Sequence, residues 1–262
     1  MQKSSVSLII STYNWPKALE TCLLSILKQK QLPDEVLIAD DGSGDETKNV
    51  IDYFKTIFPV PLIHVWQQDE GFRKTEILNK AVKESSFSYI IQIDGDVILH
   101  PDFIKDHLSV REERAFVRGT RALLTQEKTN DVLQSGDIRL NFFSKGVQNR
   151  LNALHIPLLK RLGIRKEWSS QSVRGSNLAF WKSDFILVNG YNSQLKGWGH
   201  EDEELAARFI NNHIVKKIVK LCAVQFHLYH KSASRENESI HTDSVKSTVD
   251  NQIMTCVNGY SS

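Results

Sequence analysis

The chain has 262 residues, of which 40% are hydrophobic and 24% are charged, and its formal net charge is +2. This composition excludes a disordered chain, a collagen-like repeat and a scaffold built on disulfides, because the three cysteines are too few and too far apart. No apolar run approaches the roughly 18 residues of a membrane-spanning helix, and the near-neutral charge argues against a nucleic-acid partner.

The first hundred residues alternate short apolar runs with amphipathic stretches, which predicts four strands separated by three helices. Such alternation is typical of βαβ units, so we expect an α/β fold with a mostly parallel central sheet. The predicted strands cover residues 6–10, 35–39, 62–66 and 89–93, and the predicted helices cover 17–28, 46–57 and 75–83. Ligands of parallel sheets bind beyond the carboxyl ends of the strands, where this chain carries Thr12-Tyr13-Asn14, Asp40-Asp41 and Asp94-Gly95-Asp96.

Residues 121–172 differ from the preceding part because they carry nine Lys and Arg against four Asp and Glu. Leucines are mixed with these cations between residues 140 and 166, and we predict a basic, leucine-rich, helical insertion. One interpretation is that 140–166 contacts an anionic membrane surface. The alternative is an amphipathic helix packed on the domain, although Pro157 would interrupt one long helix.

The apolar pattern returns at residues 173–181, and the remaining predicted elements are a helix from Glu201 to about Asn212 and a strand at 218–226. The sequence then turns polar towards its C-terminus. No Pro-, Gly- or Ser-rich linker divides the chain, so we expect one domain over 1–262. Its predicted parts are two halves at 5–120 and 173–235, the insertion at 121–172 and a C-terminal tail at 236–262.

Two pairs of metal-binding side chains follow predicted strands. Asp94 and Asp96 flank Gly95 at the end of an apolar strand, and carboxylate oxygens suit Mg²⁺ or Mn²⁺, which can neutralise a leaving diphosphate. His227 and His230 follow the last predicted strand, and imidazole suits Mn²⁺ better than Mg²⁺. The alternatives are a polar turn for the aspartates and ordinary structural roles for the histidines.

Four consecutive acids, Glu201 to Glu204, follow the loop Gly197-Trp198-Gly199. Acids at a helix N-terminus are favoured by the helix dipole, which accounts for some of them. A tryptophan between two glycines suggests instead a platform on which a sugar ring stacks. A carboxylate that the dipole keeps ionised also suits a general base acting on an alcohol.

Two further segments point to a nucleotide. Asp40-Asp41-Gly42-Ser43 is either a turn with a helix cap or a site that places an acid beside a ribose or a base. Gly71-Phe72-Arg73-Lys74 precedes a predicted helix and offers cations for phosphate, unless it is simply a solvated helix start. The sequence lacks a G-x-G-x-x-G loop after the first strand and a Walker A motif, which weighs against a dehydrogenase or a P-loop enzyme. A G-x-S-x-G elbow is also absent.

In their order along the chain, five segments resemble the family 2 glycosyltransferases of the GT-A fold: 6–14, 38–43, 68–73, 93–96 and 197–204. Residues 174 to 230 are similar to the C-terminal part of β-1,4-galactosyltransferases and of bacterial chondroitin-polymerase-type enzymes. The resemblance covers about residues 5–120 and 173–235 and leaves the insertion and the tail outside it. It implies a Rossmann-like nucleotide-binding half fused to an acceptor-binding half.

This resemblance implies an inverting transfer from a nucleotide sugar, usually UDP-linked, with Mn²⁺ or Mg²⁺. The residues that it assigns to the nucleotide sugar are Thr12, Tyr13, Asn14, Asp41, Gly71, Arg73, Asp94, Gly95 and Asp96. It assigns Asp96, His227 and His230 to the metal, although that branch can have Met at the position of His227. Asp202 matches the general base, and the acceptor side would be formed by Arg174, Gly175, Trp198 and Glu201.

The spacing of Leu205, Ala206 and Phe209 marks the buried face of the helix that carries these acids. Asp202 lies one turn before that face, so we expect it to point towards the sheet and the cleft. Glu203 and Glu204 would point more to solvent or act as caps, and a Glu204→Gln substitution would have little effect.

The expected function is a metal-dependent transfer to a hydroxyl of a glycan or lipid-linked acceptor in bacterial surface polysaccharide synthesis. A non-catalytic sugar-nucleotide- or glycan-binding module is the alternative, but it would lose acids that this chain keeps at Asp94, Asp96, Glu201 and Asp202. A nucleotidyltransferase is disfavoured because Thr12-Tyr13-Asn14-Trp15 replaces a glycine-rich loop. The apolar part of the N-terminus is too short for a signal peptide. By analogy with the family we therefore expect a cytoplasmic enzyme, which would be peripheral on the inner face of the plasma membrane if 140–166 contacts that surface.

Overall fold

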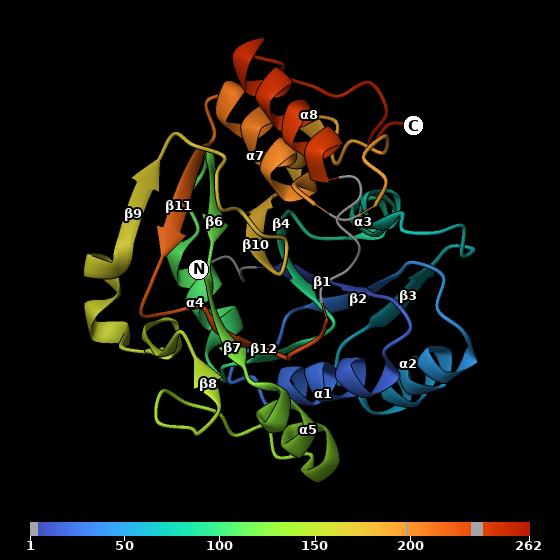
Figure 1. Ribbon diagram of the computed structural model, residues 1–262, viewed down its shortest axis with the longest axis vertical. Helices are drawn as coiled ribbons and strands as arrows, with labels where there is room; N and C mark the ends of the chain where they lie inside the picture. Colours follow the sequence, from blue (N-terminus) through green and yellow to red (C-terminus); the bar gives the residue numbers. More distant parts are fainter. Residues whose placement is uncertain (1–4, 198, 232–237) are drawn as a thin grey trace.

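The computed structural model describes residues 5–197, 199–231 and 238–262. An eight-stranded sheet forms its centre (Figure 1) and consists of β1 (Val6–Thr12), β2 (Glu35–Asp40), β3 (Leu62–Trp66), β4 (Tyr89–Asp94), β6 (Ala115–Arg118), β9 (Ile164–Glu167), β10 (Asn177–Trp181) and β11 (Val215–Val219). The order across the sheet is β3-β2-β1-β4-β10-β6-β11-β9.

The first four strands of this sheet are parallel to one another, as the sequence predicts. Every residue of β1 is buried, which is typical of parallel strands covered on both faces. The other half is mixed, because β10 runs antiparallel to β4 and β6, and β9 runs antiparallel to β11. The expected α/β fold is confirmed, and strands from the C-terminal half extend the N-terminal sheet.

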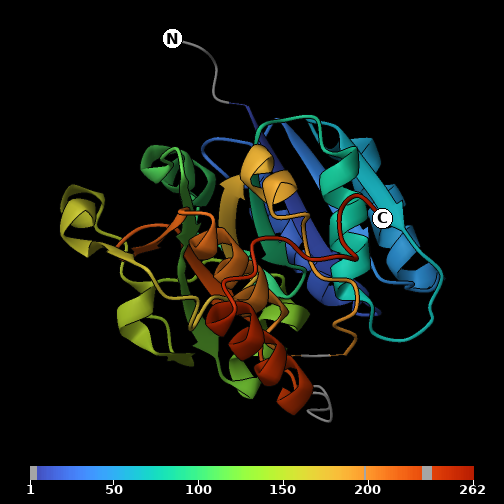
Figure 2. The ribbon, with the colours of Figure 1, turned by 90° about the horizontal axis from the view of Figure 1, so that it is seen from above.

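Helices cover both faces of the sheet (Figures 1 and 2). Alternate residues of β1 divide between two cores, since Leu8 and Ile10 belong to one and Ile9 to the other. The first core is covered by α1 (Pro16–Leu27), α2 (Asp45–Ile57) and α4 (Phe103–Val110). The second is covered by α3 (Lys74–Glu84), α6 (Lys182–Leu187) and α7 (Glu201–Asn211).

A smaller sheet brings distant parts of the chain together. Its strands are β5 (Val97–Leu99), β7 (Thr120–Leu124), β8 (Val147–Gln148) and β12 (Val224–His227), in the order β5-β12-β7-β8. Helix α5 (Gln126–Ser135) packs against it through Val132. The register pairs Val97 with His227, so the residues just before β5 lie beside the end of β12.

The prediction of a helical insertion at 121–172 is wrong. Apart from α5, this stretch forms β7, β8 and β9 and two 3-10 helices, η1 (Arg150–Ala153) and η2 (Pro157–Gly163). The amide of Ile156 donates to the carbonyl of Leu221, and the amide of Lys220 donates to the carbonyl of Gly163. These backbone hydrogen bonds between distant segments override the local leucine pattern.

The single strand predicted at 218–226 is also wrong, because β11 and β12 are separate strands in different sheets. Leu221 and Ala223 in the turn between them have φ values of 64° and 50°, a left-handed conformation that ends a strand. The carboxylate of Asp106 accepts a hydrogen bond from the amide of Ala223 at 2.9 Å and holds this turn. A continuous apolar pattern does not reveal such a turn.

The polar C-terminal segment forms helix α8 (Glu238–Asp250), which packs on α7 in both views (Figures 1 and 2). Nδ2 of Asn211, at the end of α7, donates to the carbonyls of Thr248 and Ile253. The segment therefore supports α7 directly. Within the described ranges, no helix has both the length and the apolar character needed to cross a membrane.

Candidate functional site

A cavity of about 950 Å³ lies beyond the carboxyl ends of β1, β2 and β4, where a sheet of this kind is expected to bind a ligand. Most predicted site residues line it: Thr12, Tyr13, Asp41, Gly71, Asp94, Gly95, Asp96, Arg174, Gly175, Glu201, Asp202, His227 and His230. Asn14 and Arg73 are not part of the cavity wall. Trp198, the predicted sugar platform, lies outside the described residues.

The last residue of β1, Thr12, and the next residue, Tyr13, line the cavity, whereas Asn14 does not. The Tyr13 hydroxyl donates to the carboxylate of Asp69 at 2.9 Å. Asn14 has a φ of 44°, and its Oδ1 accepts a hydrogen bond from the amide of Gly44 at the start of α2. The position of Asn14 differs from the prediction because its side chain satisfies a backbone donor of the neighbouring turn.

At the start of α3, Lys74 takes the place that the sequence assigned to Arg73. The Arg73 guanidinium contacts Glu76 at 3.2 Å and lies outside the cavity wall. The Lys74 ammonium lies 2.8 Å from Oδ1 of Asp94 and 4.0 Å from the carboxylate of Glu201. Arg73 precedes α3 with a non-helical φ of −127° and ψ of 41°, whereas Lys74 is the first residue of the helix, so the two side chains leave the chain in different directions.

The charges of Lys74 and Asp94 stabilise each other. Burial lowers the pKa of Lys74, but the carboxylates of Asp94, Asp202 and Glu201 outweigh burial and raise it above its usual value. Burial likewise raises the pKa of Asp94, yet the Lys74 ammonium and the Ser11 hydroxyl bring it below its usual value. The cavity therefore holds a fixed cation beside a fixed anion at neutral pH.

Asp41 lines the cavity just after the end of β2 and is only 6% exposed. Its carboxylate accepts hydrogen bonds from the amide of Arg73 at 2.8 Å and from Nε2 of Gln67. Burial raises the pKa of Asp41, while these hydrogen bonds lower it. Arg73 thus contributes to the site through its backbone rather than its side chain.

Asp96, His227 and His230 form a cluster whose candidate ligand atoms lie within 4.8 Å of one another. Oδ2 of Asp96 lies 3.4 Å from Nε2 of His227 and 3.2 Å from Nε2 of His230. Nδ1 of each histidine contacts a backbone carbonyl, which orients Nε2 towards the aspartate. Oδ1 of Asp96 is buried and has no hydrogen-bond partner among the described residues. One carboxylate and two imidazoles suit Mn²⁺, so these residues fit such an ion.

The two histidines differ in their affinity for a proton. The hydrogen bond to Asp96 raises the pKa of His230 to about 9. Burial lowers the pKa of His227, which lies at the end of β12. Metal binding requires the neutral form of imidazole, so we expect metal affinity to fall in acid.

Asp202 and Glu201 lie in the first turn of α7. The carboxylate of Asp202 accepts hydrogen bonds from the amide of Gly175 at 2.6 Å and from the hydroxyl of Tyr191 at 2.8 Å. Burial and the neighbouring Glu201 raise the pKa of Asp202 to about 7, although Lys74 lowers it. Burial of its charge thus opposes the helix dipole, which was expected to keep Asp202 ionised at neutral pH.

Two glycines allow the chain to approach closely at this site. A Cβ atom on Gly175 would lie 2.5 Å from Oδ1 of Asp202, and a Cβ atom on Gly95 would lie 3.1 Å from the carbonyl oxygen of Ser11. A side chain at either position would push apart segments that carry functional groups. The glycine at position 175 is therefore part of how Asp202 is held.

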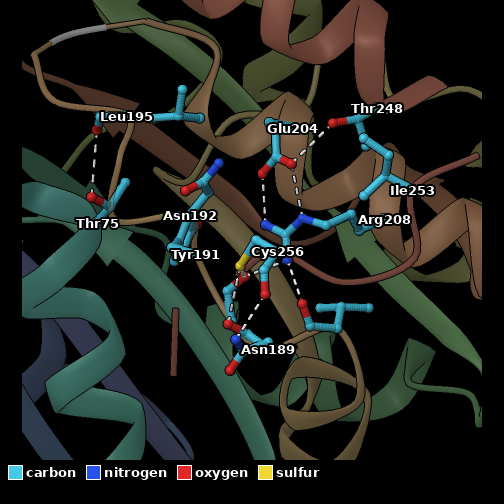
Figure 3. Close-up of polar contacts among 12 residues, drawn as sticks. Thr75, Asn189, Tyr191, Asn192, Leu195, Glu204, Arg208, Thr248, Ile253 and Cys256 are labelled. Carbon is cyan, nitrogen blue, oxygen red and sulfur yellow. Dashed lines mark hydrogen bonds and ion pairs between the residues drawn. The ribbon is translucent and has the colours of Figure 1, made fainter. Parts of the chain in front are cut away.

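The prediction that Glu204 is exposed is wrong, because it is 2% exposed and paired with the fully buried Arg208 (Figure 3). Two guanidinium nitrogens donate to the Glu204 carboxylate at 2.9 and 2.6 Å, and Nη1 donates to the carbonyls of Val188 and Gly190. The Thr248 hydroxyl of α8 also donates to Glu204. A buried guanidinium requires a partner, so Glu204 serves the fold rather than the cavity.

Sequence reasoning missed Tyr191, Gln92 and Arg121. Tyr191 and Gln92 are fully buried and hydrogen-bonded to each other, and no local pattern marks Tyr191 as the partner of Asp202 or Gln92 as the partner of Tyr191. Arg121 lines the cavity but belongs to the stretch that was taken for an insertion. The sequence does indicate Lys74, because it belongs to the segment Gly71-Phe72-Arg73-Lys74, whose cations suit phosphate.

Comparison with known proteins bears on this geometry. The family model described as glycosyl transferase family 2 matches residues 7–171, and a model described as the N-terminal domain of galactosyltransferase matches residues 162–231. The first match includes all but one residue of the stretch 121–172, which we had expected to lie outside the resemblance. That expectation is wrong for the same reason as the helical insertion, since these residues build both sheets.

Chondroitin synthase of Escherichia coli is 24% identical to this chain over 219 residues, which cover 78% of this chain and 32% of that protein. Validoxylamine A glucosyltransferase of Streptomyces hygroscopicus subsp. limoneus is 24% identical over 228 residues, covering 78% of this chain and 47% of that protein. The chain thus spans less than half the length of these two curated relatives.

Solved structures of S. aureus TarS 1-349, alone and in complex with UDP, give TM-scores of 0.61 and 0.63 at 15% identity. These alignments cover 98% of this chain and 67% and 68% of those chains. At this level of identity, the similarity establishes the fold, and it agrees with the large mixed sheet described above.

Proposed function

The chain belongs to glycosyl transferase family 2, and from this membership we propose that it transfers a sugar from a UDP-linked donor to a hydroxyl group. The acceptor is a glycan or a lipid-linked glycan, the anomeric carbon is inverted, and a divalent metal ion takes part. Relatives named as polysaccharide synthases, such as the chondroitin synthase, support a role in polysaccharide synthesis. The UDP complex of TarS supports a uridine nucleotide.

One observation carries the proposal: a single cavity holds both a metal-ligand cluster and a carboxylate suited to act as a base. Asp96, with its two histidines, has a buried oxygen that lacks a partner. Asp202 is held by two hydrogen bonds and has a raised pKa. Lys74 lies between the two groups, in contact with Asp94 and within 4.0 Å of Glu201.

On the donor side, Asp96, His227 and His230 would hold Mn²⁺ or Mg²⁺. When bound, the ion supplies positive charge that stabilises the leaving diphosphate. Lys74 adds a second cation there. The nucleotide would be lined by Thr12, Tyr13, Asp41, Gly71, Asp94 and Gly95, with Arg73 and Asn14 positioning these groups from outside the cavity wall.

On the acceptor side, Asp202 accepts the proton of the attacking hydroxyl. The acceptor oxygen forms a bond to the anomeric carbon while the bond to the diphosphate oxygen breaks, and the electron pair leaves with the diphosphate. A single displacement inverts the anomeric carbon, so no covalent intermediate with the protein forms. Glu201, Arg174, Gly175 and Trp198 would contact the acceptor, and the amide of Gly175 and the hydroxyl of Tyr191 position Asp202.

The segment 140–166 would contact an anionic membrane surface, where a lipid-linked acceptor is presented. Leu158 and Leu162 of η2 are 96% and 82% exposed, and Lys160 and Arg161 lie between them. Exposed leucines beside cations favour such a surface. Co-sedimentation with anionic liposomes at low salt tests this contact, and equal binding of wild type and a Leu158→Ser/Leu162→Ser variant would rule it out.

The experiment that tests the proposed function follows UDP release from a panel of UDP-sugars, with and without Mn²⁺. We expect release with at least one donor in the presence of a glycan acceptor, and its loss on chelation. Binding of UDP without any turnover across donors and acceptors would instead support a non-catalytic binding module. A binding assay by thermal shift with Mn²⁺ present identifies donors that bind before turnover is measured.

A further inference from the structure

A second, smaller cavity adjoins the acceptor side of the main one. Its volume is about 180 Å³, and Arg121, Leu123, Arg174 and Ser176 line both cavities. Arg118 lines only the smaller one. Three guanidinium groups therefore surround one small space next to the proposed acceptor site.

No carboxylate of the described residues lines the smaller cavity beside these arginines. Among the described residues, none of the three forms an ion pair, and Nε of Arg118 donates to the carbonyl of Ser172 at 3.1 Å. Nε of Arg121 is buried without a hydrogen-bond partner. Burial and the charge of Arg174 lower the pKa of both Arg118 and Arg121. Glu167 offsets part of this repulsion at Arg118, and Asp94 and Asp96 offset part of it at Arg121, but none of these carboxylates forms an ion pair with the cluster among the described residues.

A buried hydroxyl completes the set of donors. Ser176 is 2% exposed, and its Oγ also lacks a hydrogen-bond partner among the described residues. Its neighbour Asn177 is already committed, because its Nδ2 donates to the carbonyls of Thr120 and Ala223. Guanidinium groups and a hydroxyl that converge on one space are the donors that bind phosphate or carboxylate oxygens.

The position of Arg174 relates this cavity to the acceptor. Arg174 precedes Gly175, whose amide donates to Asp202 at 2.6 Å, so a group bound by Arg174 lies close to the proposed base. Arg121 also lies near Asp94 and Asp96, which raise its pKa. The diphosphate of the donor is therefore the competing occupant, and a test must separate the two.

We propose that Arg118, Arg121, Arg174 and Ser176 form a subsite for an anionic group of the acceptor, a phosphate or a carboxylate. This inference rests on the proposed function, because it names the class of acceptor for the same site. An acceptor without charge would leave three cations unpaired beside the base. An acceptor that carries a phosphodiester or a uronic acid next to the reacting sugar would pair with them.

The test uses inorganic phosphate and glucuronate as separate probes on the full chain saturated with UDP and Mn²⁺, so that the site for the diphosphate is already filled. Isothermal titration calorimetry should show saturable binding of at least one probe, and the probe that binds identifies the anion. Arg118→Gln and Arg174→Gln should each weaken this binding about tenfold or more, as expected for loss of a charge-assisted hydrogen bond. Arg139→Gln is the matched control, because it removes the same charge from an exposed arginine that pairs with Asp137.

A probe that binds only the UDP-free protein would assign the arginines to the donor diphosphate and overturn the proposal. The absence of saturable binding of both probes would overturn it too. If the wild type does not bind UDP at all, the proposed function is refuted. Phosphate and glucuronate can then still be titrated into the free protein, and their binding tests the anion subsite separately. Arg174 is exposed, so Arg174→Gln keeps the test decisive if the half-buried Arg118 cannot be replaced.

Discussion

The donor side and the acceptor side of the cavity are built in different ways. On the donor side, Asp41 follows β2 and Asp94 ends β4, the two parallel strands that flank β1, and their backbone ladders with β1 fix these positions. On the acceptor side, Asp202 is held by Gly175 and Tyr191, which come from separate loops and contact it through single hydrogen bonds. The difference teaches that the proposed donor groups are positioned by secondary structure, whereas the proposed base is positioned by buried polar contacts with two separate loops.

This contrast makes a prediction about stability. Changes on the donor side should remove activity and leave the fold intact. Changes around α7 should lower the stability of the fold as well as the activity, because the contacts that orient Asp202 also hold α7 in place.

The largest expected effect is that of Asp96→Ala on transfer. The side chain is 15% exposed at a strand end, and its loss removes the carboxylate of the proposed metal cluster. We expect UDP release to fall below detection and the midpoint of thermal unfolding without added metal to stay unchanged. Normal turnover of this variant, or full activity of the wild type in EDTA, would refute the metal assignment.

On the acceptor side, Asp202→Asn keeps the shape of the side chain and removes its basicity. We expect kcat to fall by about 10²–10⁴ with little change in affinity for UDP. Glu201→Gln is the matched comparison on the preceding residue and should mainly raise KM for the acceptor. If Glu201→Gln abolishes kcat while Asp202→Asn turns over normally, the two carboxylates have exchanged roles.

Glu204→Gln tests whether α7 is held by its buried ion pair. Loss of one partner leaves the Arg208 guanidinium buried without a counter-charge, which costs about 3–5 kcal/mol. We expect a large drop in the free energy of unfolding, measured by urea denaturation. Glu84→Gln, at an exposed position in the last turn of α3, is the control and should change it by less than about 0.5 kcal/mol. Equal stability of the two variants would contradict the structural role of Glu204.

The smallest effect concerns pH. Because burial raises the pKa of Asp202 to about 7, kcat should rise as the pH increases through that value and the base becomes deprotonated. In the unfolded chain this carboxyl loses its proton near pH 3.9. The free energy of unfolding of the wild type should therefore fall, relative to that of Asp202→Asn, as the pH rises from about 4 to about 7. Parallel pH profiles of unfolding for the two proteins would show that Asp202 is not perturbed.

The two sides also differ in how far the sequence predicts them. Four parallel strands, the helices between them and the acids at strand ends follow from local apolar patterns, and Asp41, Asp94 and Asp96 were found in this way. Local patterns could not show that Tyr191 bonds to Asp202 or that Gln92 bonds in turn to Tyr191, since these contacts join separate elements of the chain. They also could not show which of Arg73 and Lys74 faces the cavity, because a shift of one residue at the start of α3 decides it.

The stretch 121–172 shows a second reason for failure. Its leucines and cations suit an amphipathic helix, but its backbone pairs with residues 219–221 and with β11. The apolar pattern at 218–226 was read as one strand, although two left-handed residues divide it between two sheets. Pairing partners in a sheet are chosen by the whole fold, so periodicity alone does not identify them.

The pairing of β5 with β12 has a consequence for how this protein is made. A ribosome releases the first parallel strands, Asp94 and Asp96 long before it releases His227. Until then β5 lacks its partner strand, and its free edge is open to pairing with other chains. A nascent chain stopped before β12 would carry only Asp96 of the proposed metal cluster, because His227 and His230 come later in the chain. The last strand of the small sheet therefore gives β5 its partner and brings the first of the two histidines beside Asp96.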